Sequence, residues 1–221
     1  MRRVFKGIVF NAFTFNFQLD NFQLNSMEIT TDIVKQLRDK TGISIMQCKK
    51  ALEEVGGDME KAIMLLQKKS ADIATKKGGR TLGSGVISSY VHNTHQVGTM
   101  VELLCETDFV AKNPEFQKLA YDIAMHASAT NPQFLKKEDI DQHANELAVE
   151  MFAKEVEGKP EEMKAKILEG KLAAYWSERV LLDQAFIKNP ELKIINLIES
   201  AVQKFGEKIE LARFVRFSTT Q

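Results

Sequence analysis

The chain has 221 residues, 44% of them hydrophobic, which is enough for one good-sized core and a small additional domain. Lysine plus arginine and aspartate plus glutamate both total 30, so a net charge of +0 gives no global field that would recruit nucleic acid or an anionic membrane. No stretch approaches the roughly 20 apolar residues that span a bilayer, and 2 cysteines cannot form a disulfide framework, so we expect a folded protein of a reducing compartment without a membrane or a nucleic acid as direct partner.

Residues 1–26 differ from the rest of the chain. Three basic residues open a run rich in phenylalanine and asparagine that contains no acid before Asp20. Acid-poor basic leaders can be targeting segments, but the run lacks a continuous apolar region and a small-residue cleavage site. Three interpretations stay open: a mis-called extension upstream of a start at Met27, an organelle-type leader, or a genuine appendage. The first interpretation places the protein in the cytoplasm, and the second places it in an organelle.

Residues 27–69 predict a bundle of three short helices. Thr30 is a candidate N-cap for the first helix, and Gly42 stands where a left-handed C-cap belongs. Ser44 begins a capping-box pattern, and Asp58 is a candidate N-cap for the third helix. A bundle of about 40 residues is marginal by itself. We therefore expect it to pack against another part of the protein.

The hydrophobic period changes after a charged, glycine-rich segment. Residues 70–84 read as a helix tail that runs into a linker. Apolar and polar residues then alternate over 86–92 and 97–106 around a turn-like segment, which predicts a β-hairpin. The core domain is expected to span residues 85–221.

Helical patterns dominate most of the remaining chain. They lie at 113–127, 140–156, 160–182 and 195–205. The stop around Gly158 makes the two central helices a helical hairpin. Alternation over 208–217 predicts a third, antiparallel strand beside the β-hairpin. We therefore predict an α+β fold, with a three-helix bundle followed by a three-stranded antiparallel sheet packed with helices.

Motifs for metal, cofactor or covalent chemistry are missing from the sequence. His92 and His95 have no cysteine or acid at ligand spacing, so no metal site is expected. The phosphate-binding loop, the dinucleotide fingerprint and the nucleophile elbow are all absent. Cys48 and Cys105 have no histidine close in sequence, and free cysteine is most often a small buried hydrophobe. We expect no cofactor, and an enzyme would have to use Cys105 or Asp108.

Phe109 has unusual neighbours for a large apolar residue. It lies between Asp108 and Lys112, in the short connection between the predicted hairpin and the helix that opens at Asn113. Two interpretations follow from the residues alone. Phe109 either caps the core between strand and helix, or it is presented to a partner.

Residues 102–112, ELLCETDFVAK, resemble the signature of the elongation factor Ts family, the guanine-nucleotide exchange factors of elongation factor Tu. Residues 37–52 resemble the N-terminal module of that family, a three-helix ubiquitin-associated-like fold. Residues 182–190 and 212–217 are similar to two further family motifs. The resemblance runs from Met27 to the end and fits the short members with one core unit. The sequence departs from the family's usual residues at Ile45, Gln47, Leu104 and Ala185.

The resemblance implies a function without covalent chemistry. Such a protein binds elongation factor Tu carrying GDP and accelerates GDP release, so that GTP can bind during translation elongation. In the family the phenylalanine of the TDFV motif is inserted near the Mg²⁺ and nucleotide site. Carried over, Phe109 is the wedge and Asp108 its companion, flanked by Thr107 and Val110. The partner is expected in its GDP-bound and nucleotide-free forms.

The resemblance also implies further contacts. In the N-terminal module, Arg38, Ile45, Met46 and Lys49 match positions that meet the GTPase domain. The alternative for Ile45 and Met46 is packing inside the bundle. His92 resembles a family position near the partner, and the alternative is a solvated histidine at the hairpin tip. Short members resemble forms that act as homodimers.

Two other function classes stay open. The first is a ubiquitin-associated-like adaptor, in which residues 27–69 alone would keep the function. The second is an enzyme whose activity would be lost on Cys105→Ala. Neither class accounts for the agreement of four separated motifs with one family.

Overall fold

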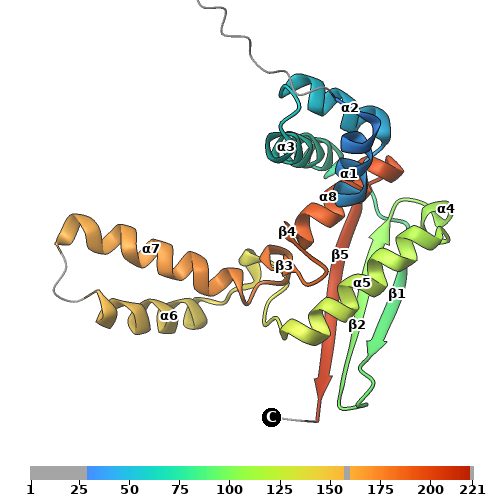
Figure 1. The fold of residues 1–221 in the computed structure, drawn as a ribbon. Helices are drawn as coiled ribbons and strands as arrows, with labels where there is room; N and C mark the ends of the chain where they lie inside the picture. The colour runs from blue at the N-terminus through green and yellow to red at the C-terminus, as the bar shows by residue number, and fades with distance from the viewer. Residues whose placement is uncertain (1–28, 157–159, 220–221) are drawn as a thin grey trace, which may run out of the picture.

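The computed structural model describes residues 29–156 and 160–219. The leader 1–26 and the predicted stop at Gly158 lie outside the described residues. The fold is α+β, as predicted (Figure 1). It contains a three-stranded antiparallel sheet and a small two-stranded sheet, with helices before and between their strands in the sequence. Within the described residues, none of the helices is both long enough and apolar enough to cross a bilayer.

Three helices form the predicted N-terminal bundle: α1 (Thr31–Thr41), α2 (Ile45–Glu54) and α3 (Met59–Lys77). The expected caps are present, since the side chains of Thr30, Ser44 and Asp58 each accept a hydrogen bond from a backbone N–H of the first turn. Gly42 ends α1 with φ 70°, a conformation that glycine adopts without steric penalty. The bundle has its own apolar core, made of Val34, Leu37, Ile43, Cys48, Ala51, Leu52, Ala62, Ile63 and Leu66.

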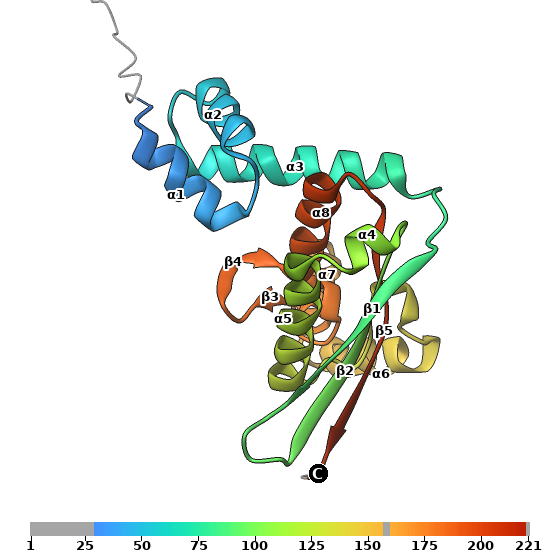
Figure 2. The ribbon, with the colours of Figure 1, turned by 90° about the vertical axis from the view of Figure 1, so that its right-hand side faces the viewer.

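The helix α3 joins this bundle to the rest of the protein. Its 19 residues make it roughly 28 Å long, and its second half lies across α8 (Ile194–Phe205), as Figure 2 shows. Ser70 is buried in this contact and donates a hydrogen bond to the Gln203 side chain. Lys77 Nζ donates to the Gly206 carbonyl at 2.6 Å. The bundle therefore packs against the core domain, as its small size led us to expect.

The larger sheet has the strand order β1-β2-β5. Its strands are β1 (Ser84–Val91), β2 (Val97–Cys105) and β5 (Ile209–Ser218), all antiparallel to their neighbours. The predicted hairpin and third strand are thus confirmed, with shifts of one or two residues at their ends. The helix α5 (Pro114–Thr130) covers one face and buries Phe116 and Ile123 against the strands (Figures 1 and 2).

The other face of this sheet is open and largely apolar. Its exposed large side chains are Ile87, Val91, Met100, Val215 and Phe217. One ion pair lies among them, between Arg213 Nε and Glu102 Oε2 at 2.6 Å. Adjacent strands supply these residues in register, so they form a continuous surface.

The helices α6 (Gln142–Glu155) and α7 (Glu161–Ser177) project from the body as an antiparallel hairpin (Figure 1). The prediction of one helix over 160–182 is wrong in its last turn, because α7 ends at Ser177. Val180 is fully buried and forms a bridge with Phe134, and the Leu181 N–H donates to the Phe134 carbonyl at 2.9 Å. These tertiary bonds stop the helix and turn the chain into the core.

Several short elements are absent from the sequence predictions. They are the one-turn helix α4 (Asp108–Ala111), the 3₁₀ helices η1 (Lys137–Asp139) and η2 (Leu181–Asp183), and the strands β3 (Ala185–Phe186) and β4 (Asn189–Lys193). Elements of two to five residues carry too few apolar repeats to show a period. The last helix α8 agrees with the predicted 195–205 within one residue, and Gly206 ends it with φ 73°.

His126 ties α5 to the β3 region from inside the core. It is fully buried, with Nε2 2.9 Å from Gln184 Oε1 and Nδ1 accepting from the Ile187 N–H at 3.3 Å. The Gln184 amide nitrogen donates to the Glu178 carbonyl, which fixes Oε1 as the acceptor toward His126. Only the neutral ring with hydrogen on Nε2 satisfies both contacts. Burial accordingly lowers the pKa of His126.

Stability should therefore fall on mild acidification. An unfolded histidine takes up a proton below about pH 6.5, whereas folded His126 stays neutral to lower pH because its pKa is lowered. The contribution of neutral His126 to the free energy of unfolding is therefore complete above about pH 6.5 and is lost as the pH falls toward the lowered pKa. Between pH 7.5 and 5.5 we expect a loss of up to about 1.4 kcal/mol from this residue, measured by urea unfolding. His126→Gln should flatten the decline, while His143→Gln on α6, an exposed site, should leave it unchanged. An equal pH slope in His126→Gln and the wild-type protein would contradict this assignment.

Candidate functional site

The TDFV segment forms a single helical turn between β2 and α5. Thr107 is the N-cap of α4, and its Oγ1 accepts from the Val110 N–H at 3.5 Å. The Lys112 N–H closes the turn by donating to the Asp108 carbonyl at 3.0 Å. Asn113 then caps α5 through its Oδ1, which accepts from the Glu115 N–H at 2.9 Å. Two consecutive caps thus define the path of the chain on both sides of Phe109.

This turn has one buried side and one exposed side. Val110 is 3% exposed and packs with Ala111 in the core, whereas the Phe109 side chain is 80% exposed. The exposure excludes the interpretation in which Phe109 caps the core between strand and helix. Burying a phenylalanine fully is worth roughly 1.5–3 kcal/mol. Phe109 therefore retains nearly all of this hydrophobic free energy for contact with another surface.

A charged pair stands beside Phe109. Asp108 Oδ2 lies 2.6 Å from Lys112 Nζ, and both side chains are exposed to solvent. The hydrogen bond and charge of Lys112 lower the pKa of Asp108, so its carboxylate is ionised at neutral pH. The segment consequently presents an apolar ring next to an anionic group.

Cys105 and Glu106, at the end of β2, attach the segment to the core domain. Cys105 is buried, its Sγ donates to the Thr107 carbonyl at 3.2 Å, and burial raises the pKa of the thiol. A buried thiol of raised pKa is poorly suited to nucleophilic attack, which argues against the enzyme interpretation. Glu106 Oε1 accepts from the Lys208 N–H at 2.5 Å and pairs with Arg80 at 3.2 Å. The Lys208 N–H is the largest cause of the lowered pKa of Glu106.

Glu207 is the residue near this segment that sequence reasoning missed. Its Oε2 accepts from the N–H groups of Glu106 and Thr107 at 3.1 and 3.0 Å, and its Oε1 accepts from Thr107 Oγ1 at 2.6 Å. It lies 100 residues from Thr107 in the sequence. Only the pairing of β2 with β5 brings the two together, so no local pattern could have indicated the contact.

The predicted N-terminal contact residues lie at the end of α1 and the start of α2. Ile45 is 57% exposed and Met46 is 71% exposed, so neither packs inside the bundle. Arg38 and Lys49 are exposed as well. The structure therefore presents two apolar and two basic side chains outward at this corner of the bundle.

A shallow pocket of about 400 Å³ connects this corner to the core domain. Arg38 and Ser44 line it from the bundle, and Glu115 and Lys204 line it from α5 and α8. Glu115 and Lys204 form an ion pair, and Lys204 lowers the pKa of Glu115. Glu115 lies in the first turn of α5, and α5 begins three residues after α4 ends, so this pocket is close in the chain to the TDFV segment.

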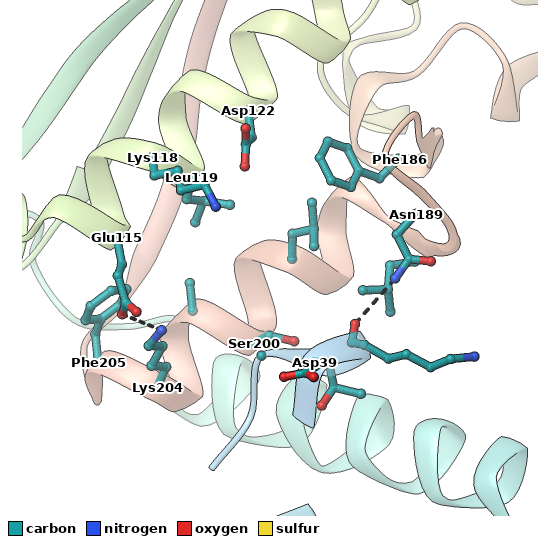
Figure 3. Close-up of a pocket in the computed structure, with 16 residues that line it drawn as sticks. Asp39, Glu115, Lys118, Leu119, Asp122, Phe186, Asn189, Ser200, Lys204 and Phe205 are labelled. Atoms are coloured by element: carbon teal, nitrogen blue, oxygen red, sulfur yellow. Dashed lines mark hydrogen bonds and ion pairs between the residues drawn. The ribbon is translucent and has the colours of Figure 1, made fainter. Parts of the chain in front are cut away.

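A second pocket, of about 340 Å³, lies in the seam between α1, α5, α8 and β4 (Figure 3). Figure 3 shows the apolar side chains of Leu119 and Phe186 in it, with charged groups around them. Asn189 Nδ2 donates to the Lys40 carbonyl at 3.4 Å, and Lys40 Nζ pairs with Glu191 at 3.0 Å. These bonds give the bundle a second attachment to the core domain, besides the contact of α3 with α8.

His92 lies away from the TDFV segment. In the β1–β2 register, Ser84 pairs with Cys105 beside α4, whereas Val91 pairs with Gly98 next to the hairpin tip. Seven residues of strand separate the two ends by roughly 23 Å. The structure does not bring His92 together with Phe109, and its role stays a prediction. Its Nδ1 lies 3.2 Å from the Tyr90 hydroxyl.

Comparison with known proteins yields one family. A family model described as "Elongation factor TS" matches residues 20–221. A protein of Thermodesulfovibrio yellowstonii named "Elongation factor Ts" is 50% identical over 196 residues, which cover 88% of this chain and 98% of that protein. Proteins of the same name are 45% identical in Thermosipho melanesiensis and 44% identical in Carboxydothermus hydrogenoformans, covering 86% of this chain in each case and 98% and 88% of those proteins.

Proposed function

Because the chain belongs to the elongation factor Ts family, we propose that it is the guanine-nucleotide exchange factor of an elongation factor Tu in translation elongation. It binds elongation factor Tu carrying GDP and accelerates GDP release, so that GTP can bind. The observation that carries the mechanism is the 80% exposure of Phe109 on a capped turn. Its function requires no cofactor and no covalent chemistry.

Exchange by such a protein is a matter of differential binding. GDP leaves faster only if the factor binds the nucleotide-free partner more tightly than the GDP-bound partner, and the coupling is reciprocal. A side chain that fits a space available only in the opened nucleotide pocket supplies that difference. Phe109 is suited to this role because an aromatic ring buries a large area with little loss of side-chain entropy.

The four residues of the motif have distinct roles in this proposal. Phe109 enters the GTPase domain beside the Mg²⁺ and nucleotide site. The ionised carboxylate of Asp108 approaches the same region and disturbs the environment that holds the phosphates. Thr107 caps the turn, and buried Val110 anchors it to the core, so the ring is held in place before the partner arrives.

The corner of the bundle supplies a second contact. Ile45 and Met46 present apolar surface, and Arg38 and Lys49 present positive charge. We propose that this corner binds the GTPase domain in both nucleotide states and brings Phe109 to the pocket. His92 is kept as a further partner contact at the opposite end of the sheet. In this proposal residues 27–69 are the contact module, 85–221 are the core domain, and 70–84 connect them. The adaptor alternative requires residues 27–69 to act alone, whereas α3 of this module packs against α8 of the core domain.

We further propose that two copies associate through the open face of the larger sheet. This face exposes Ile87, Met100, Val215 and Phe217 from three adjacent strands. Contiguous exposed apolar surface of this kind marks an interaction site. The Glu102–Arg213 pair lies within it, and in a two-fold arrangement each charged group can meet the oppositely charged group of the second copy.

The compartment that we propose for the protein is the cytoplasm. The organelle alternative depends on residues 1–26.

The exchange role predicts a large effect of Phe109→Ala. Fluorescent GDP release from elongation factor Tu, followed by stopped flow, should be strongly accelerated by the wild-type protein. Loss of an interface hot spot of about 2 kcal/mol or more should slow the accelerated release by roughly thirtyfold in Phe109→Ala. Asp108→Asn should have a smaller effect in the same direction.

Controls separate this effect from misfolding. Met64→Ala removes another exposed large side chain, 66% exposed on α3, and should keep the wild-type rate. Phe109→Ala should retain the wild-type unfolding midpoint, whereas Phe116→Ala, at a fully buried site, should lose about 3–5 kcal/mol. No acceleration by the wild-type protein would contradict the exchange role, and an unaffected Phe109→Ala would contradict the wedge.

The association of two copies can be tested by sedimentation equilibrium. The wild-type protein should show twice the chain mass of 25.0 kDa. Met100→Glu places a charge at the centre of the open face and should give the single-chain mass, while Met64→Glu, on an exposed site of α3, should not. A single-chain mass for the wild-type protein would contradict the proposed dimer.

A further inference from the structure

Reciprocal hydrogen bonds join the TDFV segment to the turn between α8 and β5. Each side contributes one carboxylate that accepts from the other side. Glu207, in the turn, accepts three hydrogen bonds from Glu106 and Thr107. Glu106, next to the segment, accepts one from the Lys208 N–H at 2.5 Å. The Glu106–Thr107 side therefore supplies one carboxylate and two backbone N–H groups, and the turn supplies one carboxylate and one backbone N–H group. We call these four residues, 106, 107, 207 and 208, the carboxylate clamp.

The turn that carries Glu207 is itself fixed on several sides. Gly206 ends α8 in the left-handed conformation, with φ 73°, and β5 begins at Ile209. The Gly206 carbonyl accepts from Lys77 Nζ at the end of α3, at 2.6 Å. Arg80, just beyond α3, pairs with the Glu106 carboxylate. The clamp thus lies where α3, α8, β2 and β5 meet, and its geometry is set by regular elements.

The Thr107 hydroxyl connects Glu207 to the helical turn α4 through two hydrogen bonds. The hydroxyl has one hydrogen, which it donates to Glu207 Oε1 at 2.6 Å. Its oxygen is then oriented to accept from the Val110 N–H, the bond that caps α4. Hydrogen bonds to an ionised carboxylate are shorter and roughly twice as strong as neutral ones. Without Glu207, the Thr107 hydroxyl and two backbone N–H groups would lose these bonds, while the core contacts of Val110 would remain.

We propose that Glu207 is a positioning residue for nucleotide exchange, which acts through Thr107 to hold Phe109 in its presented orientation. This inference rests on the exchange function proposed above. Ordering a loop at the moment of binding takes free energy from the interaction, and an already ordered loop avoids that loss. Glu207 therefore raises the rate at which a bound partner releases GDP without touching the partner or the nucleotide.

The direct test is Glu207→Gln in the full chain. The amide is nearly the same size but has a single acceptor oxygen, so it cannot accept from the two backbone N–H groups and from the Thr107 hydroxyl at the same time. The maximum rate of GDP release at saturating exchange factor should fall about tenfold, and the half-saturating concentration should stay within twofold because the N-terminal corner is unchanged. Glu210→Gln makes the same charge change on β5, where its carboxylate pairs with Lys208 Nζ, and should keep the wild-type rate.

A double mutant separates positioning from general damage. If Glu207 acts through Phe109, Glu207→Gln should cause no further loss in a Phe109→Ala protein. A wild-type rate in the single variant, or the same tenfold loss in both backgrounds, would overturn the proposal.

Amide hydrogen exchange supplies a readout that does not depend on the partner. In Glu207→Ala, which removes both acceptor oxygens, the Glu106 and Thr107 amides should exchange at least tenfold faster, while the amides of Val101 and Leu103 in β2 stay as protected as in the wild type. Should the wild-type protein fail to accelerate GDP release, the exchange function and the positioning role would both fall. Unchanged hydrogen exchange at the Glu106 and Thr107 amides would overturn the clamp, even if the protein accelerated GDP release.

Discussion

The pairing of β2 with β5 is the contact on which the rest of the structure depends. It joins the middle of the chain to its C-terminal part, with Cys105 opposite Ile209. On its covered face it lines the core against α5, and beyond its end it places residues 106 and 107 next to 207 and 208. The exposed aromatic of the TDFV turn is thus attached to the core through Cys105, Val110 and Ala111, which are buried on either side of it. Close packing of these buried neighbours restrains the backbone that presents Phe109.

A second constraint sets the spacing between the two proposed contact regions. The helix α3 belongs to the N-terminal bundle at its start and to the core domain at its end, through Ser70 and Lys77. The Lys40–Glu191 pair attaches the bundle again on the other side of the seam. Two attachments keep Ile45 and Met46 in a defined position relative to Phe109. For a factor that binds one partner at two places, such pre-organisation preserves the free energy of both contacts.

Much of this architecture could be predicted because its signals are local. The caps at Thr30, Ser44 and Asp58, the alternation in β1, β2 and β5, and the α+β class all follow from neighbouring residues. The end of α7 was missed because the helical period continues to Leu182, whereas the buried bridge of Val180 with Phe134 is a tertiary contact. The motif pointed to Phe109, but only the structure shows its exposure. Glu207 had no local signal at all, since its bonds join segments 100 residues apart.

In the proposed mechanism, Phe109 binds only when the nucleotide pocket is open. Isothermal titration calorimetry can measure this dependence with the wild-type protein and with Phe109→Ala, each titrated against nucleotide-free and against GDP-bound elongation factor Tu. We expect the substitution to weaken binding to the nucleotide-free partner by roughly thirtyfold and to change binding to the GDP-bound partner by less than threefold. Equal weakening in both states would contradict it, because uniform binding cannot drive the release of GDP.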